Sequence, residues 1–203
     1  MLARGSRRIE NRSAQLTGSR QRRGVATLWV LLAVPGVLTL LIIVTDVANM
    51  RLARIEAVNA VEAASLAAVK QWRDGGDTAS NRAAARQTAR AYAYANTVLG
   101  ERVLISANQN TSNDNDNASI SGNIVLGSIT RTGGPTGPVT FNPSASPGPN
   151  NYGVHVQAEV PVPSLWNSFG GTSFGPYSVT VQATAWMRGG TEPQLIRFDI
   201  FSP

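Results

Sequence analysis

The sequence predicts an α+β protein in which an N-terminal transmembrane helix continues into a helical stalk or hairpin and a small antiparallel β-rich domain follows. Residues 24–45 contain no charged side chain, and the alanine-rich stretch after them has helical spacing. Residues 101–203 contain short alternating runs separated by Gly, Pro and Asn, as strands and turns do. We therefore divide the chain into a basic tail (1–23), a transmembrane helix (24–45), a stalk or hairpin (46–100) and a β-rich domain (101–203).

The net charge of +6 comes entirely from the N-terminal tail. Residues 1–23 hold seven arginines and one acid, Glu10, and the rest of the chain is balanced. Because Lys and Arg flanks stay on the cytoplasmic side of a membrane, we expect a cytoplasmic N-terminus and an extracytoplasmic C-terminal domain. Basic tails also bind nucleic acid, but no aromatic residue is interleaved with these arginines, so we expect no nucleic-acid partner.

The apolar run from Gly24 to Thr45 is long enough to cross a bilayer. Its 22 residues would rise about 33 Å as a helix, against a hydrocarbon core of about 30 Å. A cleaved secretory signal is the competing interpretation, but its apolar core is usually only about 7–15 residues long. The length favours an uncleaved signal-anchor that crosses the cytoplasmic membrane once, with the lipid bilayer as its first partner.

Two helical segments follow the apolar run. Asp46–Asp74 continues the helix until Gly75-Gly76, and Asp77–Leu99 forms a second helix that Gly100 closes. The short link predicts an antiparallel hairpin, in which the many alanines let the helices approach closely. The large apolar residues of the first segment recur at helical steps, and an arginine row on the second is expected to stay solvated or to face acids; these residues are Leu52, Ile55, Val58, Leu66 and Val69, and Arg82, Arg86 and Arg90.

The remaining residues read as short strands and polar loops. The clearest strands are Tyr152–Val162 and Tyr177–Met187, whose apolar residues alternate with polar ones. This alternation places His155 on a polar face. Further strands are expected at Val103–Ile105, 120–130 and Leu195–Phe201, whereas 133–151, rich in Pro and Gly, is expected to be irregular.

The composition excludes most catalytic and metal chemistry. The chain has no cysteine and a single histidine, so disulfides, thiol catalysis and multi-His metal sites are ruled out. No nucleophile motif accompanies His155. Asp114 and Asp116 resemble the start of a calcium loop, but the later glycine and glutamate are missing, which favours a hydrated loop. We therefore expect a protein that is not an enzyme, with no cofactor and no small-molecule substrate.

An aromatic turn lies between the two clear strands. Its aromatic residues pack within the turn or the core in one interpretation and form an exposed partner-binding patch in the other. They are Trp166, Phe169, Phe174 and Tyr177.

Taken in order, these features resemble the TadE/TadG-like pilus-assembly proteins of the tight-adherence (Flp-type) system, and the TadG-like branch in particular. The resemblance begins with Arg22-Arg23-Gly24 and includes Pro35 within the apolar run and Asp46 after it. It continues through the alanine-rich acidic repeat Glu62–Ala68 and the later order of strand, aromatic turn and strand, which here is Tyr152–Val162, Pro163–Phe169 and Ser178–Ala185.

This resemblance implies a bacterial envelope protein that helps to assemble or anchor adhesive pili, with other pilus-assembly proteins or pilin helices as partners. Pilin-like members are cut after the glycine, which makes Gly24-Val25 the candidate prepilin-type cleavage point. Such members carry a glutamate five residues further on, where this chain has Leu28 or Trp29. The resemblance therefore implies a retained anchor. The alternative function is an envelope-anchored binding module unrelated to pili, with the aromatic turn as its ligand face.

Overall fold

We analysed a computed structural model of the chain, which describes residues 10–107, 123–133, 137–143, 145–164, 168–169, 172–173, 175–189 and 192–196. Side chains are described from residue 24 onward, apart from those of 168–169 and 172–173. The chain forms two compact units, Met1–Val47 and Ala48–Pro203, which we describe separately. The elements are α1 (Glu10–Gly75), α2 (Ala79–Ala95), β1 (Thr97–Val98), β2 (Glu101–Arg102), β3 (Ile124–Arg131), β4 (Val139–Pro143), β5 (Tyr152–Val162), β6 (Ser168–Phe169), β7 (Thr172–Ser173), β8 (Tyr177–Met187) and β9 (Gln194–Ile196).

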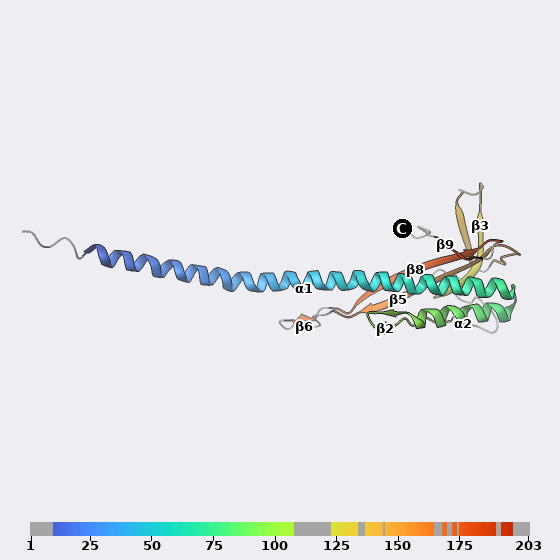
Figure 1. The fold of residues 1–203 in the computed structure, drawn as a ribbon, viewed down its shortest axis with the longest axis horizontal. Coiled ribbons are helices and arrows are strands. Elements are labelled where there is room, and N and C mark those ends of the chain that lie inside the picture. The colour runs from blue at the N-terminus through green and yellow to red at the C-terminus, as the bar shows by residue number, and fades with distance from the viewer. Residues whose placement is uncertain are drawn as a thin grey trace, which may run out of the picture. The chain divides into compact units, whose positions relative to one another are not determined.

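In the second unit, the C-terminal part of α1 and the whole of α2 form the predicted helical hairpin (Figure 1). Gly76, at φ +81°, ends α1 in a conformation that favours glycine. Thr78 then caps α2 by accepting a hydrogen bond from the backbone N–H of Asn81. At the other end of the hairpin, the backbone N–H of Leu99 donates to Glu56 Oε2 at 2.6 Å. The hairpin is therefore fixed at its turn and at its open end.

Small residues form the contact surface of the hairpin, as the sequence predicts. The large apolar residues are divided: Val69 is fully buried and Leu66 packs against the core, whereas Leu52 and Ile55 remain 49% and 61% exposed. Alanines at steps of three and four let two helix backbones approach more closely than leucines would. The alanines that are fully buried in the common core are Ala53, Ala57, Ala60, Ala64 and Ala68 of α1 and Ala85, Ala89 and Ala93 of α2.

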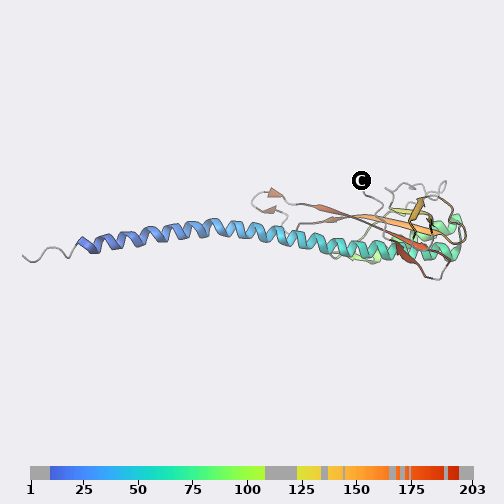
Figure 2. The ribbon, with the colours of Figure 1, turned by 90° about the horizontal axis from the view of Figure 1, so that it is seen from above.

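An antiparallel sheet of order β4-β3-β5-β8-β9 covers the hairpin (Figures 1 and 2). Its centre is the ladder between β5 and β8, which pairs all eleven residues of each strand, from Tyr152↔Met187 to Val162↔Tyr177. One face of the ladder belongs to the same buried core as the alanines of the hairpin, and the residues on it include Val154, Val156, Ala158, Val181 and Ala185. The two strands begin and end as the alternation predicts, and the α+β fold is confirmed.

Two contacts fix β5 along α1. At one end, the ring of Tyr152 meets the ring of Trp72 edge-on, with centroids 5.0 Å apart. At the other end, Asn49 Nδ2 donates to the carbonyl oxygen of Pro163 at 3.3 Å. Residues 49–72 of a helix and 152–163 of a strand each span about 35 Å, so the two elements match in length and run antiparallel.

Two sequence predictions about strands are wrong. Val103–Ile105 is not a strand: Val103 and Ile105 are buried while Leu104 is exposed, but this stretch joins no ladder. Burial alternates along these three residues because they form an extended segment that packs on the core without pairing in a sheet. The stretch 133–151 is not wholly irregular, since it contains β4, which pairs with β3. Prolines at 138 and 143 concealed this strand, and they are tolerated because β4 lies at the edge of the sheet.

Gly100 does not close α2, contrary to the prediction. The helix ends at Ala95, and the chain turns into the short β1–β2 hairpin. Leu99 and Gly100 are the two central residues of that turn, with φ of 52° and 85°. Two consecutive positive φ values are the geometry of a tight two-residue hairpin, which explains why glycine stands here.

We expect Ala89→Leu to lower the free energy of unfolding by about 2 kcal/mol, because a larger side chain at this buried position forces the α1–α2 contact apart. Ala91→Leu is the matched control: Ala91 is exposed on the same helix, and surface changes of this kind stay within about 0.5 kcal/mol. Thermal melting of the full chain in detergent, followed by tryptophan fluorescence, measures both. Equal melting temperatures for the two variants would contradict the alanine contact.

Candidate functional site

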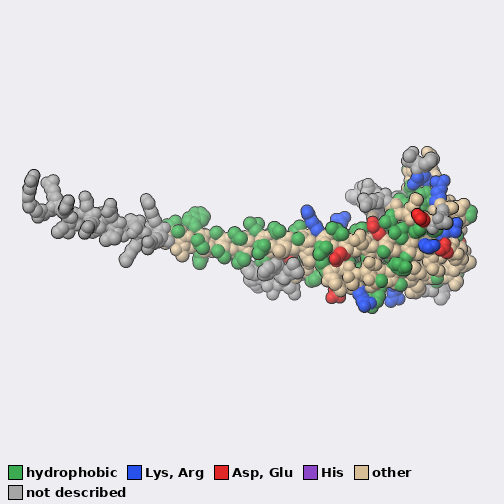
Figure 3. All heavy atoms as spheres, viewed as in Figure 1, with side chains coloured by type: hydrophobic (Ala, Val, Ile, Leu, Met, Phe, Trp, Pro, Cys, Tyr) green, Lys and Arg blue, Asp and Glu red, His purple; other side chains and the backbone are tan. Residues whose placement is uncertain are grey.

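The first unit contains an exposed apolar helix. Among the residues that the structure describes, α1 is the one helix long and apolar enough to cross a membrane, as judged by length and composition. Most of its large side chains are open to the surroundings, with Trp29 68% and Leu31 69% exposed. Figure 3 shows these hydrophobic side chains along the N-terminal part of the described helix, with no charged side chain among them. A surface of this kind suits hydrocarbon better than water.

The polar groups in this helix are satisfied by the helix itself. Thr39 Oγ1 donates to the carbonyl oxygen of Pro35, and Thr45 Oγ1 lies 2.9 Å from the carbonyl oxygens of Leu41 and Ile42. Hydroxyl groups that face lipid have no water to bond, so such internal bonds are what a membrane helix requires. Pro35 lies inside the helix without ending it.

The candidate cleavage point, Gly24-Val25, lies within α1. Nothing lies within 4 Å of the position that a Cβ at Gly24 would take, so this glycine is not required for packing in the described structure. Leu28 and Trp29 are exposed on the same helix. Cleavage of the bond between Gly24 and Val25 stays a prediction that the structure does not test.

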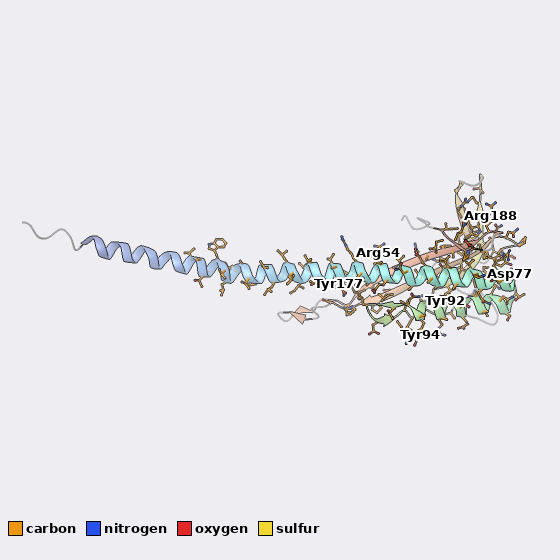
Figure 4. All side chains as sticks on the ribbon, viewed as in Figure 1. Arg54, Asp77, Tyr92, Tyr94, Tyr177 and Arg188 are labelled. Atoms are coloured by element: carbon orange, nitrogen blue, oxygen red, sulfur yellow. The ribbon has the colours of Figure 1, made fainter. Side chains whose placement is uncertain are left out.

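In the second unit, α1 carries an exposed stripe that we call the α1 flank, which consists of Arg51, Leu52, Ile55 and Val58. Arg51, Leu52 and Ile55 are exposed, and Val58 is half-buried. Arg54 is exposed beside them. Figure 4 shows Arg54 and Tyr177, the first residue of β8, at similar levels along α1. The flank therefore combines apolar and cationic groups near the start of a strand.

The turn of the helical hairpin is held by an acid that the sequence prediction did not single out for this role. Asp77 Oδ1 pairs with Arg82 Nη1 at 2.5 Å, and Ser146 Oγ donates to Asp77 Oδ2 at 3.0 Å. Asp77 thus joins the start of α2 to the loop between β4 and β5. Asp77 and Ser146 are 69 residues apart in the chain, so their contact could not be predicted without the fold.

The members of the arginine row, which the sequence predicts to stay solvated or to face acids, differ in their surroundings: Arg82 pairs with Asp77, Arg90 is exposed, and Arg86 is buried. Its side chain is 0% exposed, whereas Arg90, one turn later, is exposed. The buried face of α2 runs through Ala85, Ala89 and Ala93, so Arg86 lies at its border. The spacing within one helix predicts the row, but it does not show which of its members the fold buries.

His155 is also buried, at 2% exposed, and not on a solvated face. Its Nδ1 lies 2.8 Å from Thr184 Oγ1, and its ring lies 6.1 Å from that of Phe141. Burial lowers the pKa of His155 to about 4. The alternation of β5 is correct, but the second face of the sheet is covered at this end, where Ile129 and Trp186 are also buried.

Gly153 shows how tightly this second face is packed. A Cβ on Gly153 would lie 2.5 Å from Ile129 Cγ1 and 3.2 Å from Phe141 Cε2. The guanidinium groups of Arg131 and Arg188 lie over the ring of Trp186, at 5.2 Å and 5.7 Å from its centroid. The cluster around His155 is therefore a small second core with a cationic border, and His155 has the surroundings of a structural residue.

The other predicted positions lie mostly outside the described residues. Trp166 and Phe174 are outside them, as is the side chain of Phe169, and Tyr177 is half-buried against the common core. The partner-binding patch that these four residues would form stays a prediction. Asp114 and Asp116 are outside as well. Within the described ranges, no group of three or more His, Cys, Asp or Glu side chains could hold a metal ion.

Comparison with known families identifies the N-terminal part of the chain. Residues 24–93 match the family model described as "Putative Flp pilus-assembly TadE/G-like". This segment is TadE/G-like. The match covers the apolar helix, the alanine-rich part of α1 and most of α2, so the resemblance that the sequence suggests is confirmed there. It supports a role in pilus assembly, while the TadG-like branch stays a prediction. No curated protein and no solved structure matches the chain.

We expect the fold to lose stability as the pH falls from about 6.5 to about 4. The unfolded chain protonates His155 near its ordinary pKa of 6.5, whereas the folded chain does so only near 4. Protons therefore favour the unfolded state across this window, by about 3 kcal/mol in total. Above pH 6.5 this contribution is constant. Chemical denaturation of the full chain at pH 7.5, 5.5 and 4 measures the effect.

The matched control for this prediction is His155→Gln, which cannot titrate in this range. We expect its stability to change with pH by clearly less than that of the parent protein. If the two proteins follow the same curve, His155 is not the group responsible.

Proposed function

We propose that this protein is a non-enzymatic, membrane-anchored component of pilus assembly or anchoring in a bacterial envelope. The proposal rests on one observation: the TadE/G-like match covers two structural features, an exposed apolar helix and a helical hairpin packed through alanines. The matched residues 24–93 contain both the exposed apolar helix and the alanine hairpin. A membrane anchor that continues into a helical hairpin suits a protein that holds or guides other envelope proteins.

The proposed location is the cytoplasmic membrane, crossed once, with the N-terminus in the cytoplasm and the second unit outside. Seven arginines precede the apolar run, and Arg51 and Arg54 follow it. The excess of positive charge on the first side supports this orientation. The exposed apolar side chains of the first unit support burial in lipid.

Packing and strand contacts, without catalysis, are the proposed means of action. The single histidine is buried and faces a threonine, and a general base needs access to a substrate. Its partners would be other pilus-assembly proteins or pilin helices, in addition to the bilayer.

Thiol labelling tests the orientation cleanly, because the parent chain contains no cysteine. We expect Ser178→Cys, an exposed position on β8, to react in intact spheroplasts with a maleimide that cannot cross membranes. Ser6→Cys in the basic tail should react only after the membrane is permeabilised. The opposite pattern would reverse the orientation, and recovery of the protein in the soluble cytoplasm would remove the anchor.

Complementation of a deletion strain tests both the anchor and the pilus role. We expect the deletion to abolish surface pili and the wild-type gene to restore them. Leu32→Arg should fail to restore them, because an arginine near the middle of a membrane helix costs about 2.5–3.5 kcal/mol of insertion energy. Leu32→Ile is the matched control and should restore them. Counting pili by electron microscopy and fractionating the protein give the two readouts.

The outcomes of this experiment separate the candidate functions. Normal pili in the deletion strain would contradict the pilus role and would favour an envelope-anchored binding module. Normal pili with Leu32→Arg, together with an unchanged membrane fraction, would contradict the assigned anchor. Val25 as the mature N-terminus, found by mass spectrometry, would show cleavage after Gly24.

A further inference from the structure

We propose that the second unit rests on the bilayer surface from which α1 emerges, where Arg51 and Arg54 bind the phosphate groups of anionic lipids. One end of the β5–β8 ribbon lies beside them in the headgroup layer. We call this end, Val162–Ser164 with Gly175–Tyr177, the ribbon end. The inference rests on the proposed membrane anchor, and it adds a second lipid contact that an anchor alone does not imply.

A hydrogen bond ties the ribbon end to a residue just after the apolar run. Asn49 Nδ2 donates to the carbonyl oxygen of Pro163 at 3.3 Å, and both residues belong to the second unit. Asn49 comes four residues after Thr45, the last residue of the apolar run. Four residues span about 6 Å in a helix and about 14 Å when fully extended. The length of chain therefore keeps Pro163 near the membrane in any arrangement of the two units.

The headgroup layer lies at the depth that this tether reaches. A bilayer is about 40–45 Å thick and its hydrocarbon core about 30 Å, so each headgroup layer is about 5–7 Å thick. Thr45 and Asn49 belong to one continuous helix, α1, so the helical rise of about 6 Å applies between them. With the apolar run in hydrocarbon, Asn49 and its partner Pro163 lie among the headgroups.

The ribbon end has a composition that suits this layer. Pro163 and Pro176 are exposed, and Tyr177 is half-buried. Tyrosine is enriched at membrane interfaces, because its ring is apolar and its hydroxyl group is polar. The sequence has no charged residue between Glu159 and Arg188. Contact of the ribbon end with the bilayer therefore buries no charge of its own.

Arg51 and Arg54 are the charged residues of α1 nearest to this level. They come six and nine residues after Thr45, which corresponds to about 9 and 14 Å along the helix. Helical side chains lean toward the N-terminus of their helix, which here is the direction of the membrane. A long arginine side chain can thus carry its guanidinium group back to the headgroups. Figure 4 shows Arg54 and Tyr177 at similar levels along α1.

The two arginines are neighbours, because residues three apart lie on the same side of a helix. Both are exposed, and the ion pairs between described residues include neither of them. The nearest acids of α1 are covered or occupied: Asp46 is 6% exposed, and Glu56 accepts a hydrogen bond from the backbone N–H of Leu99. Two adjacent guanidinium groups suit a phosphate, which arginine binds with two parallel hydrogen bonds.

The opposite end of the second unit carries charges of both signs. There Lys70 pairs with Asp74, and Arg82 pairs with Asp77. Paired charges attract an anionic surface little, whereas cations without neighbouring acids attract it strongly. The charge of the second unit is therefore arranged to favour lipid contact at the end that the tether holds near the membrane.

Position favours lipid over an acidic protein as the partner of the two arginines. The anchor brings them to the same depth in every copy of the chain, where lipid phosphates are present at high local concentration. Binding of a second group near an existing anchor is effectively intramolecular, so even a weak contact is occupied. An acidic protein would have to compete with these phosphates in the same layer.

Fluorescence quenching in lipid nanodiscs tests the proposal with the full chain. The parent chain has no cysteine, so Ser178→Cys, an exposed position next to the ribbon end, accepts one fluorophore. The nanodiscs consist of phosphatidylcholine with a small fraction of quencher lipid. The quencher is a nitroxide high on the acyl chain of either phosphatidylglycerol, which is anionic, or phosphatidylcholine, which has no net charge. Both headgroups stay unmodified.

We expect the phosphatidylglycerol quencher to act on the fluorophore at residue 178 more strongly than the phosphatidylcholine quencher. Ser80→Cys is the control for depth: it is exposed near the start of α2, beyond the far end of α1, and neither lipid should quench it. Arg51→Gln combined with Arg54→Gln should lower the preference for phosphatidylglycerol about five-fold for each arginine removed, at low ionic strength.

Arg90→Gln combined with Arg188→Gln is the matched control for charge. It removes the same net charge from two exposed positions, one on α2 and one directly after Met187, at the end of β8 opposite to the ribbon end. We expect this variant to keep the preference of the parent chain for phosphatidylglycerol. Glutamine is a good helix former, so the exposed substitutions in α1 and α2 leave the helices intact.

Three results would overturn the proposal. Equal quenching by the two lipids would show that the arginines do not select lipid phosphate, as is expected if another acid occupies them. Equal loss of preference in the two double variants would show an effect of net charge alone. Quenching at residue 178 no stronger than at residue 80 would place the ribbon end away from the bilayer surface.

Failure of the proposed function gives different results. Recovery of the protein in the soluble cytoplasm would remove the anchor, and this inference with it. Normal pili in the deletion strain would contradict the pilus role alone, because the quenching measurement needs only the purified chain and lipid. A preference for phosphatidylglycerol that depends on Arg51 and Arg54 would then still support the lipid contact.

Discussion

The close approach of small residues at the helical hairpin is the constraint on which the rest of the second unit depends. Alanines of α1 and α2 are fully buried in one cluster with the inner face of the sheet. Each alanine contributes little apolar area, so a long row of them is needed to hold two helices and a sheet together. The larger side chains, Trp72 and Tyr152 among them, close the end of this thin core.

The same constraint explains where the large apolar residues of α1 lie. When the alanine face is turned inward, Leu52 and Ile55 must point elsewhere, and they remain about half exposed or more. Further along the same stripe, Val69 is buried, and Val58 and Leu66 pack against the core. Hydrophobicity alone therefore does not tell which residues of such a stripe the fold buries.

Local patterns in the sequence were sufficient to predict the helices and the long strands. The burial of individual residues depends on long-range packing and could not be predicted in this way. The two long strands and the hairpin followed from alternation, helical spacing and glycine positions. The burial of His155 and Arg86 did not, since each depends on elements that come from elsewhere in the chain. Gly153 is the one local signal of the covered second face, because a missing side chain in a strand marks a close neighbour.

The β5–β8 ribbon is longer than its described pairing with the strands on either side. Among the described residues, β3 and β9 pair with this ribbon of eleven residue pairs only at the end near Trp72. Exposed edges invite aggregation, and a chain protects those it does not use. Pro161 has no N–H to offer and so protects the edge of β5 beyond its described pairing with β3.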